Sequence, residues 1–138
     1  MARVALDADV VIAFLDASDD RHQRAIDVLR PRLSAGDSIM LAASVYAEIL
    51  VHPLQRGSDK TVDDFLAALG AEIVAIDRNI ARRAARLRAS HRTIRLPDAL
   101  SLATALATGA ELLTLDHRLT KIASSERAEA QGTRPRRT

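Results

Sequence analysis

The chain has 138 residues, 48% of them hydrophobic and 28% charged, a length and composition that fit one globular domain with its own core. It contains no cysteine, which excludes disulfides, zinc–thiolate sites and a cysteine nucleophile. Aromatic residues make up only 2%, which argues against nucleic-acid binding by base stacking, while the 20 Lys and Arg residues leave room for a local basic face.

The first half of the chain alternates between apolar runs typical of strands and the periodicity of amphipathic helices. In order, the pattern predicts a strand at 4–6, a helix at 10–15, a helix starting near 18–20, a strand at 38–42, and helices over 45–51 and 62–69. We expect the second helix to be broken from Pro31 to Gly36. Ser44 is placed to cap the helix after the second strand, and Pro53 is expected to end it.

The second half continues the alternation. The pattern predicts a strand at 72–76, a helix capped by Asp77, a helix that opens with Pro97 and stops at Gly109, and a strand at 112–115. Strands that alternate with helices predict an α/β/α sandwich around a mainly parallel sheet. We place the domain at residues 1–123 and a polar, basic tail at 124–138, in which Arg134 to Arg137 should be disordered.

No apolar run approaches the length of a membrane span, and the N-terminus lacks the layout of a signal peptide. We therefore expect a cytoplasmic protein that does not bind a membrane.

Four acids fall at one predicted edge of the sheet. Asp7 and Asp116 follow strands, whereas Glu48 and Asp98 lie near the N-termini of helices. In a parallel α/β sheet these places meet at the edge where such folds bind ligands. Each acid alone is more typical of a helix cap, a first-turn acid or a surface residue. Their coincidence at one edge is what indicates a functional site.

A cluster of four carboxylates needs a counter-charge. Two unit charges about 6 Å apart at an effective dielectric of about 20 repel by roughly 3 kcal/mol. A helix N-terminus offsets only about 0.3–1 kcal/mol of this. A bound cation is the remaining remedy, and a ligand set made only of oxygen atoms favours Mg²⁺ or Mn²⁺ over zinc. The chemistry that this predicts is hydrolysis of a phosphodiester.

The same residues resemble the PIN-domain nucleases, and among them the VapC-type toxin ribonucleases. The matching segments are ValAlaLeuAspAla at 4–8, Ser44 with Glu48, LeuProAspAla at 96–99 and LeuLeuThrLeuAsp at 112–116. The resemblance extends from the first strand to about Leu119. It implies a sandwich around a parallel sheet, RNA cleavage that depends on Mg²⁺ or Mn²⁺, homodimers, and inhibition by a cognate VapB-type antitoxin.

The resemblance also implies roles for individual residues. Asp7 and Asp98 would be metal ligands and Asp116 a further one, while Glu48 would orient the attacking water or assist proton transfer. Thr114 matches a polar position that supports the site. Asp9 departs from the family, which usually has Ser, Thr or Asn two residues after the first acid. This fifth carboxylate could tighten metal binding, although capping of the helix is the better explanation.

Two other functions stay open. Asp7 and Asp9 also resemble the opening motif of haloacid-dehalogenase-type phosphatases, in which the first Asp attacks phosphorus. That family also requires a lysine, and Lys60 and Lys121 are badly placed for it. The second alternative is a PIN-like module that binds RNA or a protein without cleaving.

An arginine stripe follows Asp77. Such a stripe is typical of a solvated face, and we hypothesise that it or the tail holds phosphates.

Overall fold

Four parallel strands form the centre of the molecule, and the computed structural model describes residues 1–132 around them. The strands are β1 (Arg3–Leu6), β2 (Ser38–Ala42), β3 (Glu72–Val74) and β4 (Glu111–Leu113). The helices of this part of the chain are α1 (Ala8–Leu15), α2 (His22–Ser34), α3 (Ala43–Arg56), α4 (Asp59–Ala68), α5 (Arg78–Ser90), α6 (Leu96–Thr108) and α7 (His117–Ala130).

The strand order is β3-β2-β1-β4, which places the first and last strands of the chain side by side. Val4 of β1 lies opposite Ile39 of β2 and Glu111 of β4, and Leu6 lies opposite Leu113. Because all neighbours are parallel, the segments that follow β1 and β4 leave the sheet at the same edge. This register brings the segments that follow β1 and β4 together at one site.

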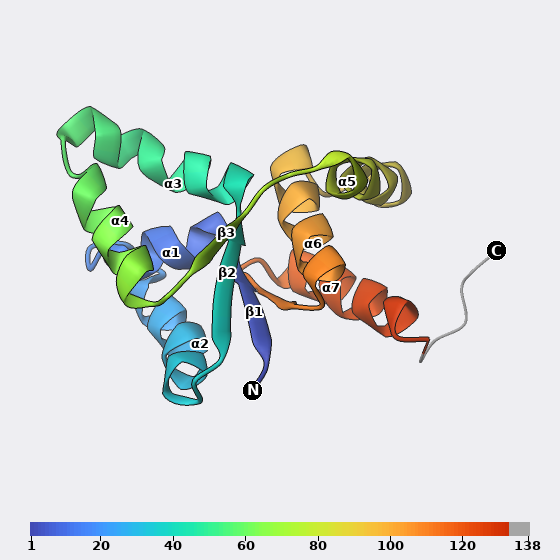
Figure 1. Cartoon of the computed structure of the whole chain (residues 1–138), viewed down its shortest axis with the longest axis horizontal. Helices are drawn as coiled ribbons and strands as arrows, with labels where there is room; N and C mark the ends of the chain where they lie inside the picture. Colours follow the sequence, from blue (N-terminus) through green and yellow to red (C-terminus); the bar gives the residue numbers. More distant parts are fainter. Residues whose placement is uncertain (133–138) are drawn as a thin grey trace.

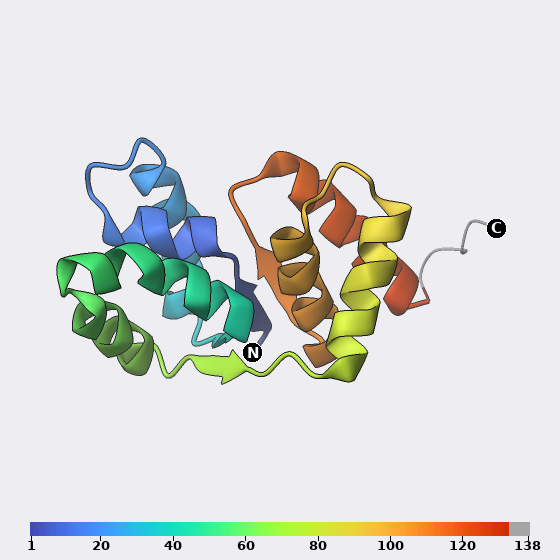
Figure 2. The same cartoon turned by 90° about the horizontal axis from the view of Figure 1, so that it is seen from above.

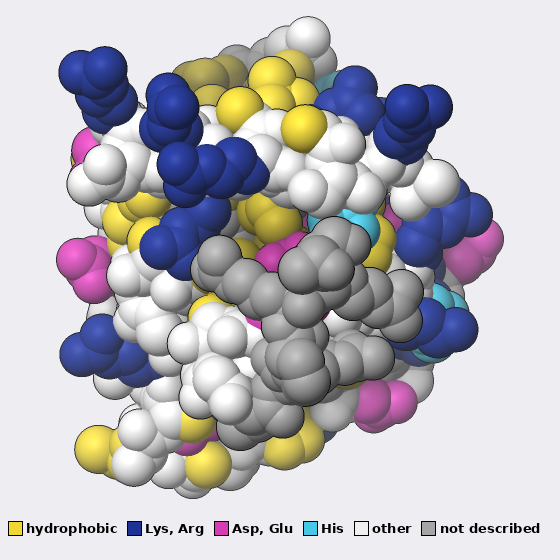
Figure 3. All heavy atoms as spheres, turned by 90° about the vertical axis from the view of Figure 1, so that its right-hand side faces the viewer, with side chains coloured by type: hydrophobic (Ala, Val, Ile, Leu, Met, Phe, Trp, Pro, Cys, Tyr) yellow, Lys and Arg dark blue, Asp and Glu magenta, His cyan; other side chains and the backbone are white. Residues whose placement is uncertain are grey.

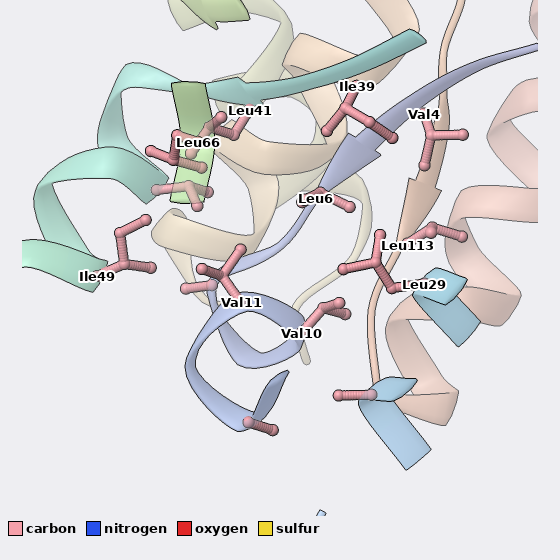
Figure 4. Close-up of a cluster of buried hydrophobic side chains, with 14 of the residues drawn as sticks. Val4, Leu6, Val10, Val11, Leu29, Ile39, Leu41, Ile49, Leu66 and Leu113 are labelled. Atoms are coloured by element: carbon pink, nitrogen blue, oxygen red, sulfur yellow. The ribbon is translucent and has the colours of Figure 1, made fainter. Parts of the chain in front are cut away.

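Helices cover both faces of the sheet, so the predicted α/β/α sandwich is confirmed. Helices α1 to α4 pack on one face and α5 to α7 on the other (Figures 1 and 2). Successive residues of a strand point to opposite faces. Val4 and Leu6 therefore join the core beneath α1 to α4 (Figure 4), whereas Ala5 joins the core beneath α5 to α7. Both cores are apolar, which fixes the sheet against slippage.

The two prolines that were expected to end helices lie inside them. Helix α2 continues past Pro31, and α3 continues past Pro53. A proline removes one helical hydrogen bond. In α2, Leu33 still packs against the core two residues further on, which stabilises the last turn. Helix α3 ends instead at Gly57, which adopts the left-handed conformation with φ of 72°.

Several other boundaries differ from the sequence analysis. Strand β3 ends at Val74 rather than 76, and β4 ends at Leu113 rather than 115. The predicted cap at Ser44 is wrong, because α3 begins at Ala43, two residues before the predicted start, and Ala42 is its N-cap. Residues 124–130, which were placed in a polar tail, continue α7. The expected disorder of Arg134 to Arg137 lies outside the described residues. None of the helices described is long and apolar enough to cross a membrane.

Candidate active site

Asp7 connects the end of β1 to the start of α1. Its Oδ1 atom accepts hydrogen bonds from the Ala8 N–H (3.0 Å) and from the hydroxyl of Ser101 on α6 (3.0 Å). The side chain is the N-cap of α1, and the residue is only 6% exposed. Asp7 therefore acts as a helix cap, one of the structural roles expected for it. Capping alone does not require burial, which is unfavourable for a carboxylate.

The pKa of Asp7 is raised to about 7, chiefly by burial. The nearby negative charges of Asp9 and Asp98 contribute to this rise. The hydrogen bonds from the Ala8 N–H and the Ser101 hydroxyl act in the opposite direction and lower the pKa. The balance of these influences favours the protonated form of Asp7 more strongly than in a free aspartate.

Thr114 joins Asp7 to Asp9. Its hydroxyl lies 3.1 Å from Asp7 Oδ2 and 3.0 Å from Asp9 Oδ2, and it accepts the Asp116 N–H at 3.2 Å. A hydroxyl has one proton and can donate to only one of the two carboxylates. The Thr114 hydroxyl therefore lies within donating distance of both carboxylates and donates to one of them at a time.

Asp9 does not cap its own helix. Its Oδ2 atom accepts hydrogen bonds from the Thr114 hydroxyl and from the Leu115 N–H, both at 3.0 Å. Asp9 therefore fastens α1 to the loop between β4 and α7. Its Oδ1 atom is buried and has no hydrogen-bond partner within residues 1–132. A buried carboxylate oxygen without a donor is available to a cation or a water molecule.

Asp98 lies in the first turn of α6 and is half-buried. Its pKa is raised, first by burial and then by the charges of Asp116 and Asp9, while Arg95 lowers it. Glu48 is exposed on α3, one turn from the helix start. Partial removal from water raises the pKa of Glu48, and the charges of Asp98 and Asp9 add to the rise.

Asp116, like Glu48, is an exposed member of the cluster. It was expected at the end of a strand, but it follows β4 by three residues and caps α7. Its Oδ1 atom accepts hydrogen bonds from the Arg118 N–H (2.9 Å) and the Leu119 N–H (3.2 Å). Its charge nevertheless raises the pKa of Asp98, so the two carboxylates are close enough to interact.

The sequence analysis missed two contributors. Ser101 lies three residues after Asp98 on the same helix and donates to Asp7. A polar residue inside an otherwise apolar helical stripe was the available signal. Arg24 of α2 donates from Nη2 to the Leu115 carbonyl (2.7 Å), which supports the same loop that Asp9 holds. Nothing in the local sequence around Arg24 indicates this contact across 91 positions.

The family model that describes the PIN domain matches residues 4–125 of this chain. This range includes every residue of the carboxylate cluster. The chain belongs to the PIN-domain family. The family match excludes the haloacid-dehalogenase alternative. In addition, the Asp9 carboxylate already accepts hydrogen bonds from the loop after β4.

Solved structures with the same fold as this PIN domain include three with low sequence identity. A toxin–antitoxin complex from Klebsiella pneumoniae is 23% identical with a TM-score of 0.64, and the match covers 82% of this chain and 86% of that one. VapC20 from Mycobacterium tuberculosis, described as a sarcin–ricin-loop-cleaving toxin, is 18% identical with a TM-score of 0.67 and coverages of 86% and 93%. VapBC2 from Rickettsia felis, bound to a DNA fragment from its promoter, has 18% identity, a TM-score of 0.67 and coverages of 86% and 92%. No curated protein matches significantly.

The donor set of this PIN domain fits a hard divalent cation. Its candidate donor atoms are carboxylate oxygens, which Mg²⁺ and Mn²⁺ prefer, and the buried Asp9 Oδ1 has no hydrogen-bond donor among the described residues. The spacing is wider than a closed site requires. Within residues 1–132, no three His, Asp or Glu side chains lie close enough together to hold an ion. The chemistry of the site therefore suits such an ion, and its ligation would require the outer side chains to rotate inward.

Proposed function

We propose that this PIN domain is a VapC-type toxin, a metal-dependent endoribonuclease that hydrolyses RNA phosphodiester bonds and is inhibited by a cognate VapB-type antitoxin. The observation that carries the proposal is the mutual electrostatic influence of acids from four separate segments. The charges of Asp9, Asp98 and Asp116 raise the pKa of other members of the cluster. A stable protein keeps such repulsion when an ion relieves it during function.

In this proposal, Asp7, Asp98 and Asp116 hold Mg²⁺ or Mn²⁺. The bound ion would neutralise these carboxylates and polarise the phosphoryl oxygen of the scissile bond. Asp7 gives up its proton when an ion is bound, because the ion favours the carboxylate form. Asp9 and Thr114 hold the loop that carries Asp116, and so fix one ligand relative to another.

Glu48 is the proposed proton acceptor. It is exposed at the edge of the cluster, and its raised pKa makes it a better base than an isolated glutamate. Water adds to phosphorus while the bond from phosphorus to the leaving ribose oxygen breaks. The proton of the water passes to Glu48, and the leaving oxygen takes a proton from solvent. Arg95, whose charge acts on both Glu48 and Asp98, lies where it can pair with a substrate phosphate.

The partners follow from the same likeness. The solved structures described above are one toxin and two toxin–antitoxin complexes. This likeness supports a toxin role and an antitoxin partner for this chain. We also propose a homodimer. A module that binds RNA without cleaving it is the competing function, and the wide spacing of the acids in residues 1–132 is the observation in its favour.

A cleavage assay separates the two functions. Purified protein is incubated with total RNA in Mn²⁺ or in EDTA, beside Asp98→Asn and the matched control Asp27→Asn, which neutralises an exposed acid on α2. We expect defined fragments with wild type and Asp27→Asn in Mn²⁺ alone. Cleavage that persists in EDTA, or in Asp98→Asn at the wild-type rate, would refute the proposed mechanism. RNA binding without any cleavage would establish the binding module.

A further inference from the structure

Helix α5 carries five arginines and no acidic residue. Ile80, Ala84 and Leu87 form its buried side. The outward side is what we call the α5 arginine face, and it consists of Arg78, Arg82, Arg83 and Arg86, all exposed. In the part of the chain that the structure describes, none of these four guanidinium groups forms an ion pair.

Helix stability does not explain this face. Like charges four residues apart disfavour a helix, and Arg78, Arg82 and Arg86 repeat at that spacing without an acid between them. Their charge is therefore available to an anionic partner. Figure 3 shows Lys and Arg side chains gathered along the upper part of the face where α5 lies.

Three of the arginines surround a hollow of about 480 Å³ between α5 and the end of α6. Arg82, Arg83 and Arg86 line it together with Thr108. Asp77 also borders the hollow, but its Oδ1 atom already accepts the Ile80 N–H at 2.8 Å as the cap of α5. Three guanidinium groups against one carboxylate leave the lining positively charged, and the planar donor sets of the guanidinium groups suit phosphate oxygens.

The character of the face favours nucleic acid over protein. Protein interfaces depend on apolar and aromatic anchors at their centre. Helix α5 exposes no large hydrophobic side chain. The exposed large hydrophobic side chains of the described residues lie on other elements, for example Val51 and Leu54 on α3 and Leu96 on α6. A surface of arginines without apolar anchors instead fits the sequence-independent attraction of a phosphate backbone.

The face lies on the helix that packs beside the one carrying Asp98. Helix α5 runs beside α6 in the opposite direction (Figure 2), so the C-terminal part of α5, which carries Arg86, lies toward Asp98 in the first turn of α6. The hollow borders the other end of α6, about 15 Å from Asp98 along the helix at 1.5 Å per residue. Arg78 and Arg86 are about 12 Å apart along the helix at 1.5 Å per residue, a span that covers more than one nucleotide.

We propose that the α5 arginine face binds backbone phosphates of the RNA strand whose scissile bond lies at the carboxylate cluster. This inference rests on the proposed function.

The test compares two triple variants that remove the same charge. One carries Arg82, Arg83 and Arg86→Gln, and the control carries Arg30, Arg56 and Lys60→Gln on the helices of the opposite layer. Glutamine has nearly the helix propensity of arginine and lysine, so both variants should fold, which circular dichroism checks. Binding of a fluorescein-labelled, mixed-sequence single-stranded RNA is measured in EDTA over a range of salt concentrations.

We expect the α5 variant to bind about tenfold more weakly at low salt. The slope of log affinity against log salt should fall by about 2 in magnitude, at roughly 0.7 for each lost phosphate contact. The control should keep the wild-type slope. In Mn²⁺, the α5 variant should cleave RNA with a raised KM and a nearly unchanged kcat.

The possible failures are distinguishable. If wild type cleaves RNA and the α5 variant keeps the wild-type slope, the phosphate-binding role is overturned while the nuclease function stands. An acidic protein partner would then be the better match for the face. If wild type cleaves no RNA in Mn²⁺, the proposed function fails, and this inference fails with it.

Discussion

Thr114 and Asp9 hold two distant parts of the chain together through one contact of 3.0 Å between Oγ1 and Oδ2. The same hydroxyl lies 3.1 Å from Asp7 Oδ2 and accepts the Asp116 N–H. It therefore contacts an acid on each side of α1's start and the backbone of a third acid. The arrangement of the candidate site depends on this one oxygen atom, which makes it the first target for mutation.

Thr114→Val should destabilise the ion-free protein by about 1–3 kcal/mol. The substitution keeps the shape of the side chain but removes one hydrogen-bonding contact each from Asp7 Oδ2, Asp9 Oδ2 and the Asp116 N–H, while Asp9 Oδ2 keeps the Leu115 N–H. Urea unfolding measures the change in free energy. Thr61→Val, at an exposed position on α4, is the matched control and should change stability by less than about 0.5 kcal/mol. Equal effects of the two substitutions would show that the Thr114 hydroxyl does not organise the site.

The stability of the ion-free protein should depend on pH through Asp7. Its pKa is about 7 in the folded protein against 3.8 as the reference value, so the folded state binds the proton more tightly. Stability from this group is fully present below about pH 4 and is lost as the pH rises to about 7. A shift of about three pKa units corresponds to up to about 4 kcal/mol.

Asp7→Asn isolates this effect. Because the variant cannot ionise, it should be more stable than wild type at pH 8 in EDTA, and the advantage should shrink at pH 4. Urea unfolding of both proteins across this range measures the difference. A constant difference between the two proteins at all pH values would contradict the raised pKa of Asp7.

Mn²⁺ should stabilise wild type more at pH 8 than at pH 5, because the ion and a proton compete for Asp7. At one hundred times the dissociation constant, the gain in unfolding free energy should be about 2.7 kcal/mol. Thermal unfolding with and without Mn²⁺ measures it. The gain should disappear in Asp98→Asn and persist in Asp27→Asn. A gain that survives in Asp98→Asn would place the ion elsewhere.

Glu48→Gln should separate catalysis from metal binding. If Glu48 accepts the proton of the attacking water, its loss should lower kcat by about 10²–10⁴-fold. The stabilisation by Mn²⁺ should stay close to that of wild type, since Glu48 is not among the proposed ligands. Single-turnover cleavage and thermal unfolding test the two expectations on the same preparation. Loss of the Mn²⁺ effect would make Glu48 a ligand instead.

The sequence by itself determined the order of strands and helices as far as β4, because the periods of apolar residues differ between the two, but it did not predict helix α7. Val4 and Leu6 enter one core and Ala5 the other, because consecutive residues of a strand point to opposite faces. Local chemistry was sufficient for the cap at Asp77 and the stop at Gly109, whose φ is 68°. It failed at Pro31 and Pro53, because a missing hydrogen bond can be offset by core packing that local sequence does not reveal.

Only the tertiary structure decided what the acids do to one another. Asp7 and Asp9 meet Thr114 because β1 pairs with β4, a register set by apolar residues more than 100 positions apart. The same pairing made Asp9 a fastener of a distant loop, where the sequence favoured a cap. Burial of Asp7, the main cause of its raised pKa, likewise depends on tertiary packing, whereas the hydrogen bond from Ser101 of α6 opposes the rise. Charge interaction depends on distance in space, which the spacing of residues along a chain does not give.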